Sequence, residues 1–436
     1  MSVNVIITLI MLLAIIVLVF KAPASPGVIF TGVPIIAALF MGFSLAEING
    51  FIGNGLKSVS GTLFLMVFAV LYFNILTEAG VFNALVKFIM RFLGNSVLGS
   101  VLVAAVLSMA SALSASGATT ALCTIPTMRP VFEKQKIRAT ALLLVESLGS
   151  GIIILLPWAP GINEAASYVG VDVYNVYLFL RPLIIFCIVA LLLMCIPISI
   201  LEKRHGAGMT KEEFDVMKAE ISKPVELPYG KGVAIFDGVV TIVLLIALLS
   251  GKISTNVGFG FGYVLLLMVN FHSAKERGEY MKRHSPVALN MAFTMLGVGV
   301  LVGINGGTGA LNDLANYIAA NVNSGFLTHL PFILCLLSLP LSITIGGTKN
   351  SVILPALIPI VTSLGLGFTA EQVLGAVFAT GVISANVNLF NAAPYLALSL
   401  AGGVEMKDHL KYSLVPIYGF SLLMLAFMVV TGMLPI

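Results

Sequence analysis

The segment Gly117-Ala-Thr-Thr-Ala-Leu-Cys-Thr-Ile-Pro126 sets the architecture of this chain, because a related segment, Gly346-Gly-Thr-Lys-Asn-Ser-Val-Ile-Leu-Pro355, occurs in the second half. Both segments place Gly nine residues before Pro, and both have Thr at the third position. Each lies in an apolar stretch, 96–131 or 325–366, that is too long for one membrane crossing and has a small, polar break near its centre. The pattern predicts two re-entrant helical hairpins, each of which enters and leaves the membrane on one side.

A second break follows each hairpin tip about thirty residues later, inside predicted broken helices at 138–170 and 371–402. The breaks are Leu156-Pro-Trp-Ala-Pro-Gly-Ile-Asn163 and Asn386-Val-Asn-Leu-Phe-Asn-Ala-Ala-Pro394. The order of hairpin tip, return helix and broken helix therefore occurs twice, which predicts an internal repeat. Non-helical backbone in hydrocarbon costs several kcal/mol for each unpaired group, so such breaks persist only in packed protein or beside a wet cavity. We therefore predict that both tips and both breaks converge on a central substrate site.

The composition places the chain in a membrane as an all-α polytopic protein. Of its 436 residues, 59% are hydrophobic and 10% are charged, and its mean hydropathy is +1.07, whereas a soluble domain carries about 25% charged residues. Amphipathic stretches at 46–58, 81–94 and 306–323 are expected to lie along the membrane surface. Besides the two hairpins, about ten segments can cross the membrane; they are 3–20, 25–43, 60–79, 138–156, 176–201, 233–250, 253–271, 286–304, 371–400 and 411–434.

Lys and Arg residues predict the orientation, because they gather in cytoplasmic loops. With this topology, 19 of the 23 Lys and Arg residues fall on the cytoplasmic side, and both termini lie outside, in the periplasm or the extracellular space. The expected location is the inner membrane of a cell. The polar segment 203–232 is predicted to be a cytoplasmic linker between residues 1–202 and 233–436. Five crossings precede it, so the two halves are predicted to be inverted repeats.

Polar groups at the tips and breaks are the candidate substrate ligands. Helix N-termini that face a cavity supply N–H donors and a partial positive charge for an anion, and exposed carbonyls or Ser, Thr and Asn side chains can coordinate a cation. A lone Ser-x-Ser-Gly would more often be ordinary helix packing, but two related tips with their own breaks favour a binding site. The predicted substrate-binding residues are Ser114, Ser116, Gly117, Thr119, Thr120, Asn163, Gly347, Thr348, Lys349, Asn350, Ser351, Asn386, Asn388 and Asn391.

Ionisable residues inside the predicted spans need a reason, because each costs at least a few kcal/mol there. Lys349, at the second tip, is predicted to pair with a substrate carboxylate, although a lysine can also snorkel or pair with a local acid. Glu146 and Glu164 are predicted ion-coupling residues, because a carboxyl group shielded from water can exchange a proton near neutral pH. Either could instead pair with Lys349 or Arg181. Asp237, near a predicted helix end, is expected at the membrane interface.

Other residue types give weaker signals. None of the four Cys or five His residues has metal-ligand spacing, so no metal site and no cofactor is expected beyond a coupling Na⁺ or H⁺. Trp158, beside the first break, is expected either to contact the substrate or to act as a structural wedge. The cluster of Gly303, Gly306, Gly307 and Gly309 is expected to mark a helix end. The net charge of +4 does not indicate a nucleic-acid partner.

Several of these motifs resemble those of the citrate–metal symporter (CitMHS) family of the ion-transporter superfamily, in order along most of the chain. The resemblance implies a scaffold, a transport domain that carries both hairpins and moves as an elevator, and a homodimer. It also implies transport of citrate or similar carboxylates, often with a metal ion, driven by protons or sodium. The motifs are Ser116-Gly-Ala-Thr-Thr, Thr124-Ile-Pro126, Leu155-Leu-Pro-Trp-Ala-Pro160, Thr308-Gly-Ala-Leu, Leu339-Pro-Leu-Ser342 and Leu396-Ala-Leu-Ser-Leu-Ala-Gly402.

The two tips depart from the family pattern. Members that take metal–citrate resemble Asp-Gly-Asp-Gly at the first tip, where this chain has Ser114-Ala-Ser-Gly117. At the second tip, an Asp followed by aromatic residues is usual, where this chain has Gly347-Thr-Lys-Asn350. Hard divalent cations prefer carboxylate oxygens, so a bare organic anion is the better expectation for the substrate.

The sequence thus predicts a secondary active transporter that couples H⁺ or Na⁺ to symport of citrate or a related di- or tricarboxylate by alternating access. The alternative is a cation/proton antiporter in which Glu146 and Glu164 bind the ion and no organic substrate exists. A membrane-embedded enzyme is disfavoured because no HExxH, paired-Asp or nucleophile–base motif occurs. A channel is disfavoured because inverted halves around a gated site fit alternating access. The expected partners are a small organic anion and membrane lipid.

Overall fold

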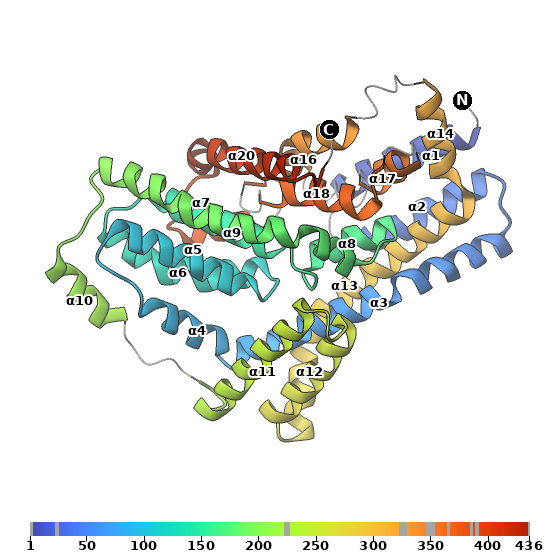
Figure 1. Ribbon diagram of the computed structural model, residues 1–436. Helices are drawn as coiled ribbons and strands as arrows, with labels where there is room; N and C mark the ends of the chain where they lie inside the picture. The colour runs from blue at the N-terminus through green and yellow to red at the C-terminus, as the bar shows by residue number, and fades with distance from the viewer. Residues whose placement is uncertain are drawn as a thin grey trace.

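The computed structural model describes residues 3–21, 26–221, 227–321, 329–345, 354–363, 367–383, 387–388 and 392–434. Most of these residues form α-helices, and none of them forms a strand (Figure 1). The all-helical part of the fold prediction is therefore confirmed.

The first half of the chain contains three helices, a short helix, a helical hairpin, a broken helix and a long helix, in that order. They are α1 (Val3–Lys21), α2 (Pro26–Phe40), α3 (Leu45–Glu78), α4 (Val81–Met90), the hairpin of α5 (Val97–Ala112) and α6 (Gly117–Lys134), the broken helix of α7 (Ala139–Ile153) and α8 (Pro160–Val169), and α9 (Val173–Arg204).

After the linker helix α10 (Lys211–Ile221), the second half has helices of similar length in a similar order. They are α11 (Lys231–Leu249), α12 (Thr255–Asn270), α13 (Ala274–Thr308), α14 (Ala310–Asn321), the pair α16 (Leu330–Ile345) and α17 (Leu354–Ser363), the broken helix of α18 (Ala370–Val382) and α19 (Ala392–Leu400), and α20 (Met406–Val430).

Five of the described helices, α3, α9, α11, α13 and α20, are long and apolar enough to cross a membrane. Shorter apolar helices, among them α2, α5, α7 and α12, accompany them. This establishes a multi-pass membrane protein, whereas the count of ten crossings stays a prediction.

The long helices α3 and α13 are equivalent in the two halves and lie antiparallel against each other. Each begins with the same capping box, in which Ser44 and Glu47, or Ser273 and Glu276, exchange side-chain and backbone hydrogen bonds. Near one end of the pair, Gly55 of α3 meets α13, and near the other end Glu78 of α3 forms an ion pair with α13. If the two halves have opposite orientations in the membrane, their equivalent helices run antiparallel, as α3 and α13 do.

Glycines allow the backbones of α3 and α13 to approach closely. A Cβ atom at Gly55 would lie 1.9 Å from the carbonyl oxygen of Gly299, and one at Gly303 would lie 2.1 Å from the carbonyl oxygen of Phe51. Small residues at such spacing are the usual means of close helix packing in membranes. The glycine cluster also marks the end of α13, as expected, because Gly309, with φ +66°, caps the helix; Gly303 has the additional role of packing against α3.

One sequence expectation about the surface helices is wrong. The segment 46–58 is not a separate surface helix, because α3 runs without interruption from Leu45 to Glu78 and packs Gly55 against α13. Asp237, near the start of α11, has a fully buried side chain that accepts hydrogen bonds from Asn270 Nδ2, at the end of α12, at 3.0 and 3.1 Å; its depth in the membrane stays a prediction. The short helices α4 and α14 do occur within 81–94 and 306–323.

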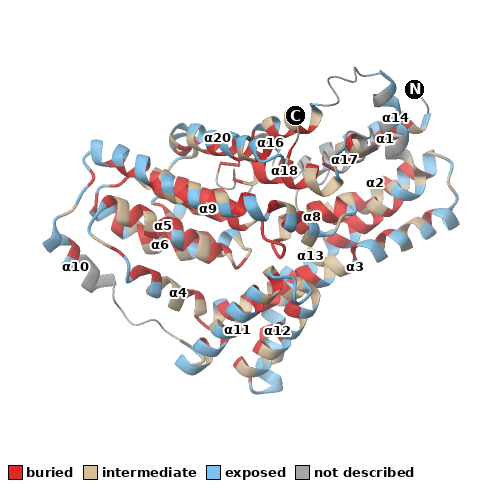
Figure 2. Cartoon of the chain, viewed as in Figure 1, coloured by how far each residue is buried: buried red, intermediate tan, exposed pale blue. Residues whose placement is uncertain are grey.

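The helices pack in two groups, with α8 between them (Figure 1). One group contains α1, α2, α3, α11, α12 and α13, and the other contains α5, α6, α7, α9, α16, α18, α19 and α20. The ring of Tyr168, in α8, meets that of Phe30, in α2, at 5.5 Å between centroids. Buried residues follow the centre of the molecule, from α5 and α9 to α8, whereas α10 is mostly exposed (Figure 2).

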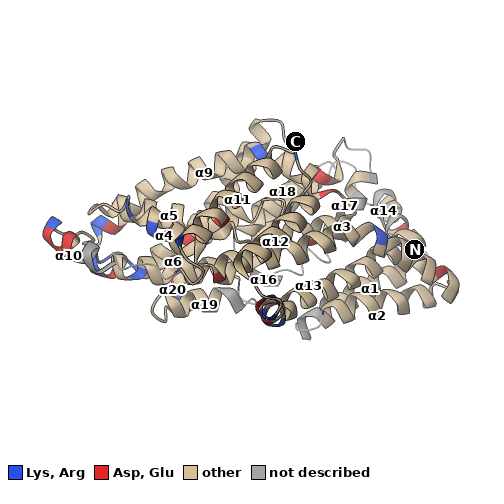
Figure 3. Cartoon of the chain, turned by 90° about the horizontal axis from the view of Figure 1, so that it is seen from below, with Lys and Arg blue, Asp and Glu red and all other residues tan. Residues whose placement is uncertain are grey.

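Lys and Arg residues gather toward the end of the molecule that carries α10 (Figure 3). Ion pairs also lie at helix ends: Glu202, at the end of α9, pairs with Arg138 at 2.7 Å, and Glu78, at the end of α3, pairs with Arg283 at 3.0 Å. This asymmetry fits the predicted cytoplasmic end; the orientation of the termini stays a prediction.

Candidate functional site

The first hairpin turns at residues 113–116, where the structure places the predicted tip. Ala115 has a φ of +57°, a left-handed conformation that allows the sharp reversal between α5 and α6. The base of the hairpin is also closed, because Gln135 Nε2 donates to the carbonyl oxygen of Asn95 at 3.5 Å. Both ends of the hairpin therefore lie on the same side of the tip, as predicted.

Hydroxyl groups at this tip hold the turn itself. Ser116 caps α6, because its Oγ accepts hydrogen bonds from Thr119 N at 3.2 Å and from Thr119 Oγ1 at 3.1 Å. Ser114 Oγ donates to Ser111 O at 2.8 Å, and Thr120 Oγ1 donates to Ser116 O at 2.9 Å. The backbone of Gly117, in the first turn of α6, is exposed at the tip. Backbone N–H groups in a first turn have no partner within the helix, so they can donate hydrogen bonds to a ligand.

The first break is held together by Asn163. Its Nδ2 donates to Pro157 O at 2.8 Å and to Ala159 O at 2.9 Å, so it pairs two carbonyl groups of the break between α7 and α8. Trp158 is 1% exposed and its Nε1 donates to Leu113 O at 3.1 Å, which ties the break to the hairpin tip. Of the two expectations for Trp158, the structure supports the wedge.

The helix α7, which leads into the first break, lies against the start of the second break. Ser147 Oγ, in α7, donates a hydrogen bond to the carbonyl oxygen of Ile383 at 3.2 Å. Ile383 is the residue that caps the C-terminus of α18. A Cβ atom at Gly151 would lie 2.7 Å from the Cα atom of Ile383, so only glycine permits this approach. The first tip thus contacts the first break, and α7 contacts the start of the second break; the convergence of both tips and both breaks on one site stays a prediction.

The second break is tied to α16. Asn388 is 5% exposed and its Nδ2 donates to Ser342 O at 2.9 Å. This parallels the bond from Trp158 to Leu113 in the first half. Other predicted ligands lie outside the described residues, so their place in the site stays a prediction; they are Gly347, Thr348, Lys349, Asn350, Ser351, Asn386 and Asn391.

The two candidate coupling carboxyl groups lie on either side of the first break. Glu146 is 1% exposed in the middle of α7, which is buried from Ala141 to Ile153. Glu164, in the first turns of α8, accepts a hydrogen bond from Tyr168 Oη at 3.0 Å. Glu146 is therefore shielded from water, whereas Glu164 is partly exposed; they precede and follow the break that Asn163 holds.

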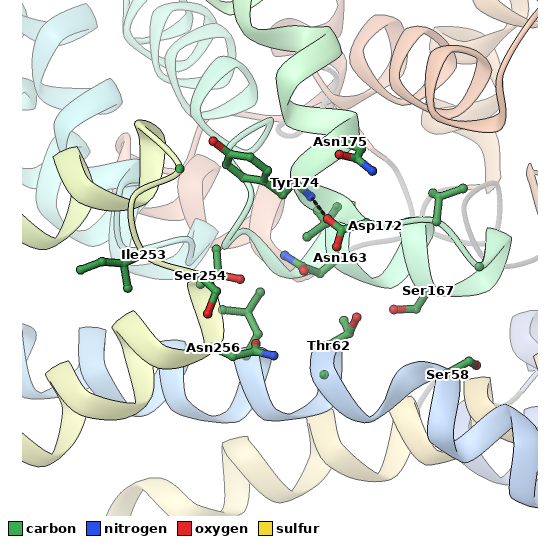
Figure 4. A pocket seen from close by; sticks show the side chains of 17 residues that line it. Ser58, Thr62, Asn163, Ser167, Asp172, Tyr174, Asn175, Ile253, Ser254 and Asn256 are labelled. Carbon is green, nitrogen blue, oxygen red and sulfur yellow. Dashed lines mark hydrogen bonds between the residues drawn. The ribbon is translucent and has the colours of Figure 1, made fainter.

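A polar cavity of about 560 Å³ opens on the other face of α8, between α3, the start of α9 and the loop from α11 to α12. Asn163 and Ser167 of α8 face it, together with Thr62 of α3 and Asn256 of α12 (Figure 4). The buried oxygens Asn163 Oδ1 and Ser167 Oγ have no hydrogen-bond partner among the described residues. They are thus available to water or a ligand. Asn163 places this cavity directly beside the first break.

Sequence reasoning missed the wall of this cavity. Ser58, Thr62, Ser167 and Asn256 are small polar residues in mostly apolar helices, a pattern also typical of ordinary helix packing. The available signal was the spacing of polar residues by four, at Ser58 and Thr62 and at Asn163 and Ser167, which places each pair on one helix face. The described residues contain no group of three or more His, Cys, Asp or Glu side chains that could hold a metal ion.

Comparison with known proteins finds relatives of this chain among citrate transporters. The CitMHS citrate transporter model matches residues 1–345. The "Citrate transporter" of Bacillus subtilis (strain 168) is 25% identical over 396 residues, which are 90% of this chain and 90% of that protein. The "Mg(2+)/citrate complex secondary transporter" of the same organism is 26% identical over 385 residues, or 87% of each chain.

A solved structure shows the same fold. The YdaH transporter of Alcanivorax borkumensis superposes with a TM-score of 0.58 at 15% sequence identity, over 90% of this chain and 91% of that one. The match to the family model covers most of the helices that build the site, including the first hairpin and both helices of the first break. The chain therefore belongs to the CitMHS family of citrate transporters.

Proposed function

We propose that this protein is a secondary active transporter that carries citrate or a related di- or tricarboxylate together with H⁺ or Na⁺ by alternating access. The single observation that carries the proposal is the packing of the first tip on the first break, through Trp158 and Leu113, next to the contact of α7 with the start of the second break, through Ser147 and Ile383. Membership of the citrate transporter family supports the substrate class.

The helix N-termini in this region suit an anion. The first turns of α6 and α8 offer backbone N–H groups and the positive end of a helix dipole. Lys349, at the predicted second tip, would add a positive charge for one carboxylate. In this proposal the two halves are inverted repeats, the group that carries the first hairpin moves against the other as an elevator, and two chains form a homodimer.

The chemistry of the first tip supports a free carboxylate as substrate, without a metal ion. Ser114 and Ser116 stand at the tip positions where the pattern of metal–citrate transporters in this family has Asp. Both hydroxyl groups already form hydrogen bonds within the turn. Neutral hydroxyl groups are poor replacements for carboxylates as ligands of a hard divalent cation. One relative is named for the Mg²⁺–citrate complex, so the two substrate forms should be compared directly.

Uptake of labelled citrate into proteoliposomes tests the proposal, with and without Mg²⁺, an inward Na⁺ gradient or an inward proton gradient. We expect uptake driven by one of the two gradients, and no requirement for Mg²⁺. Lys349→Ala should lower uptake at least about ten-fold, because one charge-assisted hydrogen bond is worth roughly 1.5–3 kcal/mol. Lys252→Ala, a change of an exposed loop lysine, is the matched control and should transport normally.

One result would contradict the proposal, and a second would reject only the role given to Lys349. Cation–proton exchange that proceeds equally without any carboxylate would support the antiporter instead. Normal citrate uptake by Lys349→Ala would reject the role of that lysine while leaving the substrate class intact.

A further inference from the structure

An apolar groove of about 310 Å³ lies between α7, α9 and α20, away from the site described above. Leu144, Met194, Ile198 and Pro416 form its wall. The neighbouring side chains of α9 and α20 are exposed and apolar, as the contact surface with lipid should be; they include Leu193 at 59%, Ile196 at 44% and Val415 at 79%. The groove therefore faces the hydrocarbon.

Two basic residues stand at one end of this groove. Arg138, before the first residue of α7, and Lys411, in the second turn of α20, both line it. This end also carries the last residues of α9, with Lys203 and Arg204. The groove thus changes from an apolar wall to a cationic rim along its length.

The rim is held rigidly by Glu202. Its carboxylate accepts hydrogen bonds from Arg138 Nη2 at 2.7 Å and from Tyr412 Oη at 2.8 Å. The guanidinium carbon of Arg138 lies 4.7 Å from the centre of the Tyr412 ring. Glu202 is fully buried whereas the Arg138 side chain is 38% exposed, so the arginine presents a fixed outer face to the groove. Because Glu202 balances the charge of Arg138, the net positive charge among the residues that line this rim comes from the exposed Lys411.

We propose that this groove binds an anionic phospholipid, with one acyl chain along the apolar wall and the phosphate at Arg138 and Lys411. The groove and the lipid match in two respects. The apolar wall suits an acyl chain, which a soluble anion lacks, and the cationic rim favours an anionic headgroup over a zwitterionic one. Basic pockets between membrane helices on the cytoplasmic side recognise such headgroups in this way. Because the site joins α7 and α9 to α20, the lipid stabilises the group of helices that carries the first hairpin.

The full-length protein in detergent tests this through its thermal unfolding midpoint and through native mass spectrometry of bound lipid. Phosphatidylglycerol should raise the midpoint at concentrations where phosphatidylcholine with the same chains has no effect. Lys411→Gln should require roughly five-fold more phosphatidylglycerol for the same shift. Lys275→Gln, which removes one exposed charge at the start of α13, should behave like the unchanged protein.

Two additional measurements separate the parts of the site. Met194→Trp fills the groove without changing the rim, and it should weaken the effect of phosphatidylglycerol. Glycerol 3-phosphate, which has the headgroup chemistry but no chains, should not reproduce the shift. Equal stabilisation by phosphatidylcholine, full stabilisation by glycerol 3-phosphate, or an unchanged response of Lys411→Gln would each overturn the proposal.

Discussion

Glu146 is the residue whose chemistry most directly tests ion coupling. Its side chain is 1% exposed, in the buried middle of α7. If it carries the proton, Glu146→Gln keeps the volume and removes the exchangeable proton, so citrate uptake should no longer respond to an imposed pH gradient. Glu164→Gln provides the same test for the second candidate. The measurement is proteoliposome uptake against the size of the proton gradient.

Glu212→Gln, in the exposed linker helix α10, is the control for a lost carboxylate outside the membrane. It should retain the complete gradient response. Full stimulation by a proton gradient in both Glu146→Gln and Glu164→Gln would show that neither carboxyl group couples transport. A dependence on Na⁺ alone would assign coupling to sodium and remove the proton role.

Several polar residues that the sequence offered as substrate ligands serve the backbone. Ser114, Thr120 and Asn163 donate their hydrogen bonds to carbonyl groups of the tip or the first break. An unpaired carbonyl group costs free energy in a low-dielectric interior. These side-chain donors therefore bond to nearby backbone carbonyl groups and are not free to bind a ligand. Residue type and position predicted where the polar groups lie, but not which partner each one takes.

Among the elements, the contact between α3 and α13 depends on glycine. Gly303→Val should destabilise the protein by at least about 1–3 kcal/mol, the usual cost of inserting atoms into a packed core, because a Cβ atom there would lie 2.1 Å from Phe51 O. Gly306→Ala is the matched control on the same helix, since nothing lies within 4 Å of its added Cβ. Thermal unfolding in detergent compares the two. Equal midpoints would show that the helices can separate without cost.

The same elements show what periodicity can and cannot predict. The capping boxes Ser44–Glu47 and Ser273–Glu276 are local, and a sequence pattern is sufficient to find them. The spacing of Gly299 and Gly303 by four also indicates a close helix contact, but it does not name the partner. Phe51 and Gly55 meet these glycines only because α3 and α13 fold back against each other.

For the whole molecule, the proposed elevator requires α8 to move against α3. Thr62 and Ser167 face the same cavity from these two helices (Figure 4). In a Cys123→Ser background, Thr62→Cys with Ser167→Cys should allow a short bifunctional thiol reagent to join the helices and stop uptake. Each single cysteine variant should keep transporting after the same treatment. The remaining cysteines, Cys187, Cys195 and Cys335, are buried.

The cross-linked fraction is measured by the mobility of the intact chain and by mass spectrometry of the joined peptides. Uptake that continues unchanged in fully cross-linked protein would contradict movement between the two helices. In that case alternating access would have to arise within one group of helices.

Sequence alone was sufficient for the membrane class, for the first hairpin tip and for both breaks in helices, because composition, helix length and Gly or Pro punctuation are local properties. The packed structure was needed to show that Ser147 meets Ile383, that Asn163 borders both the first break and a polar cavity, and that Asp237 is buried. These contacts join residues that lie on different helices or far apart in the chain. They depend on how whole helices pack in three dimensions, which the period of a single helix does not encode.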